Sequence, residues 1–169
     1  MKRIIALIGC SMLLAPVYAQ TNLKTDSLTV TDVKTGLMWM RYDFSFLKKR
    51  FLNNWNECFS WQQAINNERY AGFNDWRVPS ISEYRTINHS KADRDQYLLK
   101  FFELDTTCVW GKGAYSFWSK NEKGPYNASY ISFIDGFATS GDKEKQVAGG
   151  DWEGISFGFS VRLVRAIKK

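Results

Sequence analysis

The chain has 169 residues and a formal net charge of +6, and 44% of its residues are hydrophobic. This length favours a single domain once any processed segment is removed, and 7 Trp, 8 Tyr and 12 Phe can build a substantial core. The charge does not indicate nucleic-acid binding, because the one basic cluster, Lys48-Lys49-Arg50, is explained by a solvated loop.

The N-terminus has the features of a secretory signal peptide. Lys2 and Arg3 precede an apolar stretch over residues 4–16, and Val17-Tyr18-Ala19 before Gln20 suits a cleavage site. The apolar stretch is too short to span a bilayer. We therefore predict cleavage near Ala19, which leaves a net charge of +4 and a mature chain without a transmembrane segment.

This division predicts a signal peptide at residues 1–19, a short lead at 20–27 and one domain at 28–169. The expected location is secreted, periplasmic or at the cell surface. A lipoprotein anchored at Cys10 is the alternative, because Leu7-Ile8-Gly9-Cys10 resembles a lipobox. In an oxidising compartment Cys58 and Cys108 suggest a disulfide, although both also suit small buried apolar positions.

Two short strands are expected first along the domain. Residues 28–31 and 37–40 have strand character, and the turn between them at 32–36 ends in Gly36, which can adopt positive φ. Residues 41–53 carry few signals. A helix is then predicted from an N-cap at Asn54 to about Asn67, with an apolar stripe that turns Cys58 toward the core.

A turn, an extended segment and a second helix follow within residues 72–84. Pro79 disfavours helical dihedrals at Val78. Ser80 and Glu83 have the spacing of a capping box, in which each side chain accepts the other residue's backbone N–H. We interpret this stretch as a structural junction and predict a helix from about Ile81 to Asn88.

The C-terminal half is expected to consist of strands and long loops. Residues 130–134 predict a strand, and Asp135-Gly136 predicts a hairpin turn. Residues 155–163 alternate strictly, which predicts a strand with one wholly apolar face. Long loops are predicted at 105–130 and 140–154, and long loops inside a compact domain are commonly functional.

Four segments in this order resemble the DUF1566 family, also called the Lcl C-terminal domain. They are VTDVKTGLMW (30–39), WNECFSWQQAINNERYAGFNDWRVPSISEY (55–84), FWSK (117–120) and SFGFSVRLVR (156–165). The last also resembles the related Fibrobacter succinogenes major paralogous domain. The resemblance implies an α+β, C-type-lectin-like fold: two helices, a small twisted antiparallel sheet, paired N- and C-terminal strands and a long loop region for ligand contacts. It also implies a bacterial surface module used in carbohydrate binding and adhesion.

The chain departs from this family pattern at one cysteine. Many relatives have Cys where this chain has Leu163, and that residue often pairs with the helix cysteine that corresponds to Cys58. If Cys58 forms a bond here, its partner must be Cys108 or another molecule. Residues 41–53 resemble a local insertion.

Catalytic and metal-binding patterns are scarce. The one histidine, His89, is expected in a surface or helix-capping role, and no hydrolase, Walker or dinucleotide motif occurs. The cysteine pair of formylglycine-generating enzymes, which share the broader fold, is missing. We predict a protein that is not an enzyme and has no cofactor. Calcium stays open because carboxylates gather near the C-terminal loops, namely Asp135, Asp142, Asp151 and Glu153.

Aromatic residues in the predicted loops are the best candidates for ligand contacts, because aromatic faces stack on sugar rings while polar neighbours fix hydroxyls. The predicted binding residues are Trp110, Tyr115, Tyr126, Asp151 and Trp152. For Trp110 and Trp152, burial beneath the loops is an equal alternative. Structural roles are predicted for Trp39, Trp76, Arg77, Pro79, Ser80, Glu83, Trp118 and Arg162.

The sequence thus predicts a non-catalytic binding module for a glycan or a surface protein, with no nucleic-acid partner. An envelope interaction module without a small ligand is the second hypothesis, and an enzyme of the formylglycine-generating fold group is the third. A concave aromatic patch with polar neighbours would favour a glycan, whereas a flat apolar patch of several hundred Å² would favour a protein partner.

Overall fold

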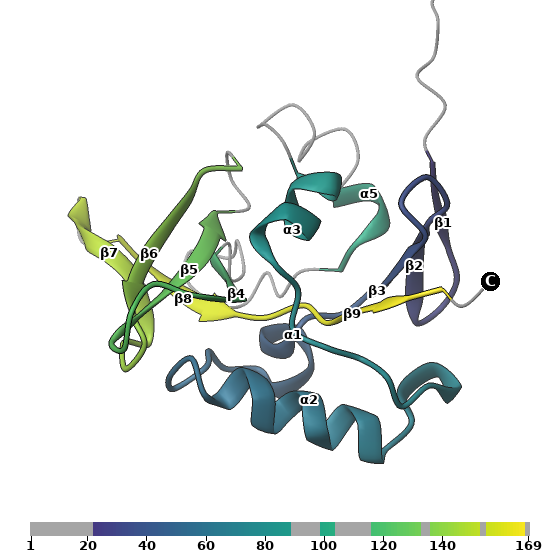
Figure 1. Cartoon of the computed structure of the whole chain (residues 1–169), viewed down its shortest axis with the longest axis horizontal. Helices are drawn as coiled ribbons and strands as arrows, with labels where there is room; N and C mark the ends of the chain where they lie inside the picture. The colour runs from purple at the N-terminus through teal and green to yellow at the C-terminus, as the bar shows by residue number, and fades with distance from the viewer. Residues whose placement is uncertain (1–21, 89–98, 104–115, 133–135, 153–154, 168–169) are drawn as a thin grey trace, which may run out of the picture.

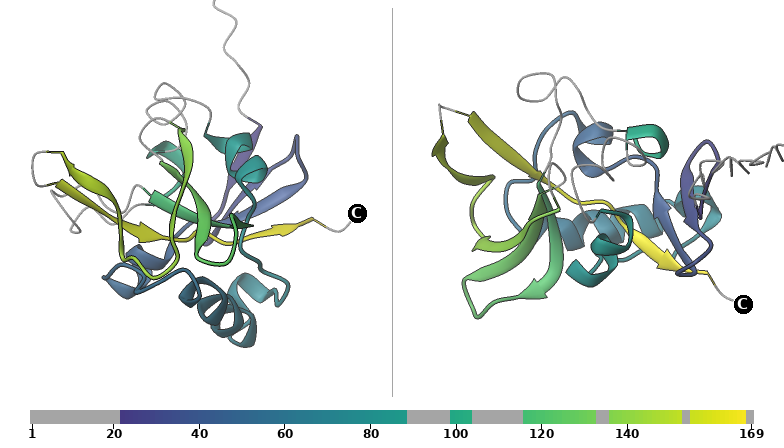
Figure 2. Two further views of the ribbon diagram at one scale, coloured as in Figure 1. Left: turned by 60° about the vertical axis from the view of Figure 1, so that its left-hand side comes forward. Right: turned by 90° about the horizontal axis from the view of Figure 1, so that it is seen from above.

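The structure is a computed structural model that describes residues 22–88, 99–103, 116–132, 136–152 and 155–167. The predicted signal peptide, His89 and Cys108 lie outside these ranges. The chain is α+β, with two sheets joined by a C-terminal segment that runs between them (Figure 1). Helix α2 lies on one side of this segment and helix α3 on the other (Figures 1 and 2).

The first sheet is antiparallel and has the strand order β1-β2-β3-β9. Its strands are β1 (Leu23–Thr25), β2 (Thr29–Asp32), β3 (Leu37–Met40) and β9 (Val164–Ala166). The turn predicted at 32–36 is present: Asp32 Oδ1 accepts the N–H of Lys34 at 3.0 Å, and Gly36 has a φ of +70°. The C-terminal β9 pairs with β3, so both ends of the described chain contribute to this sheet.

The second sheet has the order β6-β5-β4-β8-β7, and only its β4–β8 pairing is parallel. Its strands are β4 (Ser116–Glu122), β5 (Asn127–Ser132), β6 (Ala138–Asp142), β7 (Val147–Trp152) and β8 (Ile155–Ser160). The predictions of long loops over 105–130 and 140–154 were wrong where the structure describes these residues, because β4 and β5 occupy part of the first range and β6 and β7 most of the second. Glycines within β6 and β7 made these two strands difficult to recognise in the sequence, because Gly is depleted from strands in general.

The segment predicted as a single strand at 155–163 divides into β8 and a linker to β9. Its apolar residues Phe159, Val161 and Leu163 are buried, as the alternation predicts. Its polar side chains Ser160 and Arg162 are fully buried as well, so the polar face opposite the apolar one is not exposed to solvent there. The reason is that residues from the first half of the chain cover it: the N–H groups of Phe44 and Leu52 donate to the carbonyls of Val161 and Phe159.

A short helix, α1 (Phe44–Lys48), occupies part of the segment in which the sequence shows few signals. Asp43 is its N-cap and accepts the N–H of Phe46 at 3.0 Å. The helix ends at Lys49, whose φ of 55° places it in the left-handed region. The capping aspartate is the local signal that could have located this helix.

Helix α2 (Glu57–Asn67) has its N-cap at Asn56, two residues after the N-cap predicted at Asn54. The Asn54 side chain does accept the N–H of Glu57 at 3.0 Å, so it closes the turn before the helix. The predicted apolar stripe is buried, with Cys58, Trp61 and Ile65 facing one core cluster. A 3-10 turn, η1 (Tyr70–Gly72), follows. The side chain of Trp76 contacts this turn, because its Nε1 donates to Tyr70 O at 3.0 Å.

Helix α3 (Ile81–Ile87) starts with the capping box that the sequence predicts. Ser80 Oγ accepts the N–H of Glu83 at 3.2 Å, and Glu83 Oε2 accepts the N–H of Ser80 at 2.8 Å. Burial raises the pKa of Glu83, but hydrogen bonds from Arg77 and from the Ser80 backbone outweigh it and lower the pKa to about 2. A further short helix, α5 (Leu99–Phe101), follows later in the chain.

None of the helices within the described ranges has the length and apolar character needed to cross a membrane.

Candidate ligand-binding cleft

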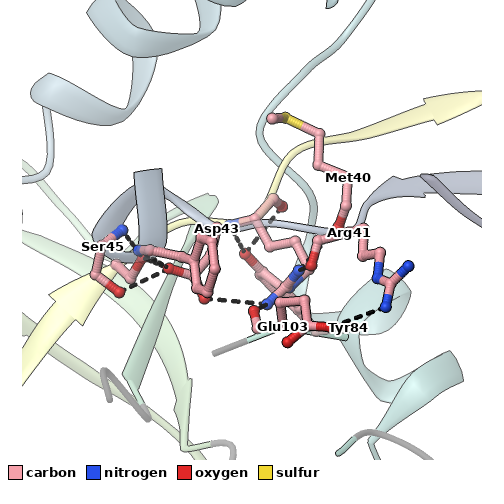
Figure 3. A network of polar contacts seen from close by, with 9 residues as sticks. Met40, Arg41, Asp43, Ser45, Tyr84 and Glu103 are labelled. Carbon is pink, nitrogen blue, oxygen red and sulfur yellow. Dashed lines mark hydrogen bonds and ion pairs between the residues drawn. The ribbon is translucent and has the colours of Figure 1, made fainter. Parts of the chain in front are cut away.

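A buried ion pair between Arg162 and Asp43 fixes the centre of the molecule (Figure 3). Arg162 Nη2 lies 3.0 Å from Asp43 Oδ2, and both side chains have no solvent exposure. The same guanidinium donates to three backbone carbonyls, those of Met40, Arg41 and Glu103. A buried charge needs this degree of pairing, because its desolvation is otherwise very costly.

Two hydroxyl groups complete the network on the aspartate side. Ser45 Oγ donates to Asp43 Oδ1 at 2.6 Å, and Ser160 Oγ donates to the same oxygen at 3.0 Å. Tyr84 of α3 joins the network from the helix side, since its hydroxyl accepts the N–H of Arg162 at 3.1 Å. The buried network, of which Figure 3 labels Tyr84 and Asp43, therefore ties α3 to the C-terminal segment.

A polar cleft of about 550 Å³ lies between α3 and the sheet formed by β4, β5 and β6. Most of its lining side chains carry hydroxyl, amide or charged groups. They come from Ile81, Ser82, Arg85, Asn121, Glu122, Lys123, Ser129, Ala138, Thr139 and Ser140. A cleft of this size and polarity is suited to a small hydrophilic ligand.

Two contacts hold the helical wall of the cleft against the sheet. Asn121 Oδ1 accepts the N–H of Ile81 at 2.9 Å, and Pro79 O accepts the N–H of Lys120 at 2.9 Å. Together with the capping box, they set where α3 begins relative to the end of β4. The cleft is therefore built on a preorganised wall and not on a free loop.

The cleft combines cationic groups with hydroxyl groups. Arg85 on α3 and Lys123 after β4 are exposed, and neither forms an ion pair or side-chain hydrogen bond with another described residue. Glu122 is the acidic residue among the lining, and its carboxylate pairs with Lys143 Nζ at 2.7 Å. Ser82, Thr139 and Ser140 add exposed hydroxyls.

Tyr126, the predicted binding residue whose side chain the structure describes, does not line this cleft. Tyr126 is 77% exposed in the β4–β5 hairpin, three residues after Lys123. Asp151 and Trp152 belong to β7, whose side chains are not described. Trp110 and Tyr115 lie outside the described residues.

The residues predicted to have structural roles lie in the core or at the junction. Trp39, Trp76 and Trp118 are at most 1% exposed, and Trp118 stacks on Phe159 with ring centroids 4.0 Å apart. Arg77 donates to both carboxylate oxygens of Glu83, and Pro79 leads into the Ser80 cap. Arg162 is in the buried network already described.

Cys58 is a free thiol and is fully buried, so the structure does not support the suggested disulfide with Cys108. Burial raises the pKa of the Cys58 thiol well above its usual range, which makes the thiol unreactive at neutral pH. Within the described parts of the chain, no three His, Cys, Asp or Glu side chains come together as metal ligands. Of the carboxylates considered for calcium, Asp142 is exposed at the end of β6, while Asp135 and Glu153 lie outside the described residues.

Sequence reasoning missed the cleft because its lining residues carry no motif. Arg85 and Lys123 are 38 positions apart, and the sequence gives both the appearance of ordinary surface cations. The capping box is the one signal in the sequence that bears on the cleft, because it defines where α3 begins. From that start, Tyr84 is buried and the next residue, Arg85, is exposed.

The family comparison agrees with the resemblance carried by the sequence motifs. A family model described as the Lcl C-terminal domain matches residues 28–149. This range includes α3 and all the residues that line the cleft. The comparison with curated proteins gives no match.

Proposed function

Because this chain belongs to the Lcl C-terminal domain family, we propose that it is a non-catalytic module that binds a glycan in the cleft between α3 and strands β4 to β6. On this proposal the two sheets and their helices form a C-type-lectin-like domain that the predicted signal peptide directs out of the cytoplasm. The family match supports the choice of a domain type, and the cleft supports the choice of a ligand site. Fold alone does not define the ligand.

The observation that carries the proposal is the chemistry of the cleft. Hydroxyls from Ser82, Thr139 and Ser140 and charged groups from Arg85 and Lys123 lie around one concavity. Sugar hydroxyls both donate and accept hydrogen bonds, so they match such a mixed lining. Recognition would rest on hydrogen bonds more than on ring stacking, because aromatic side chains do not occur among the described lining residues.

The distribution of exposed apolar residues gives weaker support to a protein partner. Among the described residues, the large exposed apolar side chains are Leu28, Val33, Leu47, Tyr126 and Phe137. They belong to four different connections and to helix α1, whereas a protein interface is expected to gather such residues in one patch.

The proposal is tested by filling the cleft without disturbing the core. Ser140 is exposed on β6, so Ser140→Phe should block the cleft and leave the melting temperature within a few degrees of that of the unsubstituted protein. Binding is measured on a glycan array, with hits confirmed by calorimetry. Ser140→Phe should lower binding at least tenfold.

Ser27→Phe is the matched control, because Ser27 is exposed in the β1–β2 turn away from the cleft. It should bind like the unsubstituted protein. Equal glycan binding by the Ser140→Phe and Ser27→Phe proteins would place the site elsewhere, and the absence of glycan binding by the unsubstituted protein would reject the proposed ligand class.

A further inference from the structure

We propose that two copies of this chain pair through the outer edge of β6, antiparallel and centred on Ser140, so that their clefts join into one groove. β6 ends the second sheet, and β5 is the one described strand that pairs with it (Figure 1). An open sheet edge carries unpaired N–H and C=O groups that can accept a further strand. The pairing can be tested without a glycan, whereas the use of the joined groove for a glycan rests on the proposed function.

The register of β5 and β6 shows which backbone groups point out of the sheet. Lys143, the residue after β6, donates its N–H to Tyr126 O at 2.9 Å, so every second residue back from Lys143 faces β5. The backbone groups of the residues between them, Ala138, Ser140 and Asp142, therefore point away from β5. The N–H and C=O groups of Ala138 and Ser140 form no hydrogen bond with another described residue.

The other three sheet edges are short, covered or irregular, which are common ways of blocking strand addition. β1 has only three residues and carries the exposed Lys24. On the outer side of β9, Arg77 and Val164 exchange two backbone hydrogen bonds of 2.9 Å. β7 has a register shift between Ala148 and Trp152. By contrast, the five residues of β6 pair with β5 without a shift and include neither Lys nor Pro.

The outward groups of β6 allow the strand to pair with itself. In an antiparallel pair centred on Ser140, the two copies of Ser140 exchange N–H···O=C bonds, and Ala138 lies opposite Asp142 of the second copy. This register uses all three outward-facing residues. Asp142 O already accepts the N–H of Lys145 at 3.2 Å, but a carbonyl oxygen has a second lone pair.

The charges of β6 are compatible with this register, which favours a second copy over an unrelated strand. Like charges directly opposite each other destabilise a strand pair. Asp142 is the one charged residue of β6, and the register separates its two copies by about 13 Å along the strands. The residues at the centre, Thr139, Ser140 and Gly141, are small and uncharged.

The pairing also determines how the two clefts are placed. The two-fold axis of an antiparallel strand pair is perpendicular to the sheet, so both α3 helices lie on the same face of the joined sheet. Ala138, Thr139 and Ser140 line the cleft beside α3. The floor of one cleft therefore continues into the floor of the other, and Arg85 of each copy lies on opposite walls of one groove.

Sedimentation velocity over a range of concentrations measures the pairing, with the protein expressed from its full sequence. The unsubstituted protein should show a reversible monomer–dimer equilibrium. Ser140→Pro removes an outward N–H and no N–H of the β5–β6 ladder, so the dimer loses two hydrogen bonds. Its dissociation constant should rise about thirtyfold, while the monomer keeps its melting temperature within a few degrees. Ser140→Thr keeps the N–H and is the matched control, which should pair like the unsubstituted protein.

A charge exchange tests the register itself. Because the two copies of Ser140 lie opposite each other, neither Ser140→Lys nor Ser140→Glu should pair with itself, but an equal mixture of the two should form a dimer. The same changes at Ser27, which is exposed in the β1–β2 turn, should leave the pairing unchanged. All variants have the same N-terminus, so differences between them report on β6.

The outcomes decide between the possible occupants of the edge. A protein that stays monomeric at every concentration its solubility allows would overturn the proposal, even if β6 captures an extended peptide. A dimer that Ser140→Pro leaves unchanged would place the contact elsewhere and overturn it equally. If Ser140→Pro does not fold, the charge variants decide, and a mixture that fails to pair overturns the proposal.

The result is independent of the glycan test. A dimer with the expected variant pattern but without glycan binding would support the pairing and count against the proposed function. Glycan binding by a strict monomer would support the proposed function and overturn the pairing.

Discussion

Two arginines near α3 meet opposite surroundings, and the contrast separates the part of the molecule that holds the fold from the part that we propose binds a ligand. Arg162 is fully buried and is paired with Asp43 and with three backbone carbonyls. Arg85 is exposed at the cleft and has no ion pair among the described residues. The protein thus neutralises one of the two cations internally, while the other is exposed at the cleft.

Helix α3 connects the two regions. Tyr84 directs its hydroxyl into the buried network, and the next residue, Arg85, lines the cleft. A short helix whose start is fixed by a capping box can therefore hold the cleft wall at a set distance from the core. If the proposed function holds, stability and binding depend on adjacent residues, so substitutions there should separate the two properties.

The largest effect is expected from breaking the buried ion pair. Arg162→Met leaves the Asp43 carboxylate buried without its partner, which should lower the free energy of unfolding by about 3–5 kcal/mol. Urea unfolding followed by circular dichroism measures it. A loss below about 1 kcal/mol would show that the network does not hold the fold and would remove the contrast with Arg85.

A smaller effect is expected at the start of α3. Ser80→Ala removes the side chain that accepts the N–H of Glu83 and should cost about 0.5–2 kcal/mol of unfolding free energy. Ser27→Ala is the control, because Ser27 is exposed in the β1–β2 turn, away from the cap. Equal melting temperatures for the two variants would mean that the cap does not stabilise the junction.

Acid should weaken the same junction through Glu83. The pKa of Glu83 is lowered to about 2 from an ordinary 4.5, so its ionised form stabilises the folded state above pH 4.5. That contribution should disappear as the pH falls from about 4.5 toward 2. At pH 6, Glu83→Gln should be less stable by about 1 kcal/mol after allowance for solvent screening. The gap between the two proteins in urea unfolding should narrow with acid, and a constant gap would contradict this assignment.

The smallest effect on stability is expected at the cleft. Arg85→Ala removes an exposed side chain without a described partner, so the free energy of unfolding should change by no more than about 0.5 kcal/mol. Binding of the glycan identified on the array should nevertheless weaken severalfold. A large loss of stability would place Arg85 with Arg162 in the structural group.

Local features of the fold were predictable because they depend on neighbours a few residues apart. The Asp32–Gly36 turn and the Ser80–Glu83 capping box are of this kind, and so is the buried stripe of α2. The start of α2 was predicted too early because Asn54 is a competent cap that closes a turn, whereas the helix begins at Glu57. One-dimensional patterns therefore locate elements better than they locate their ends.

The candidate site was not predictable in the same way. The aromatic residues favoured by the sequence do not line the cleft where the structure describes them, and Tyr126 is exposed on a neighbouring hairpin. The cleft gathers side chains from residues 81 to 140, and Lys143 pairs with Glu122 from 21 positions away. None of these distances in sequence corresponds to a motif.

By itself the sequence determined the family, the α+β class and the capped junction, because caps, turns and apolar periodicity act within a few residues. Only the tertiary structure decided that Arg162 is a buried ion-pair partner, that β4 and β8 run parallel, and that Arg85 and Lys123 line one cleft without an ion pair to another described residue. The physical reason is that burial and charge pairing depend on which distant segments pack together, and a charged residue has the same appearance in the sequence whether the fold neutralises it or leaves it exposed.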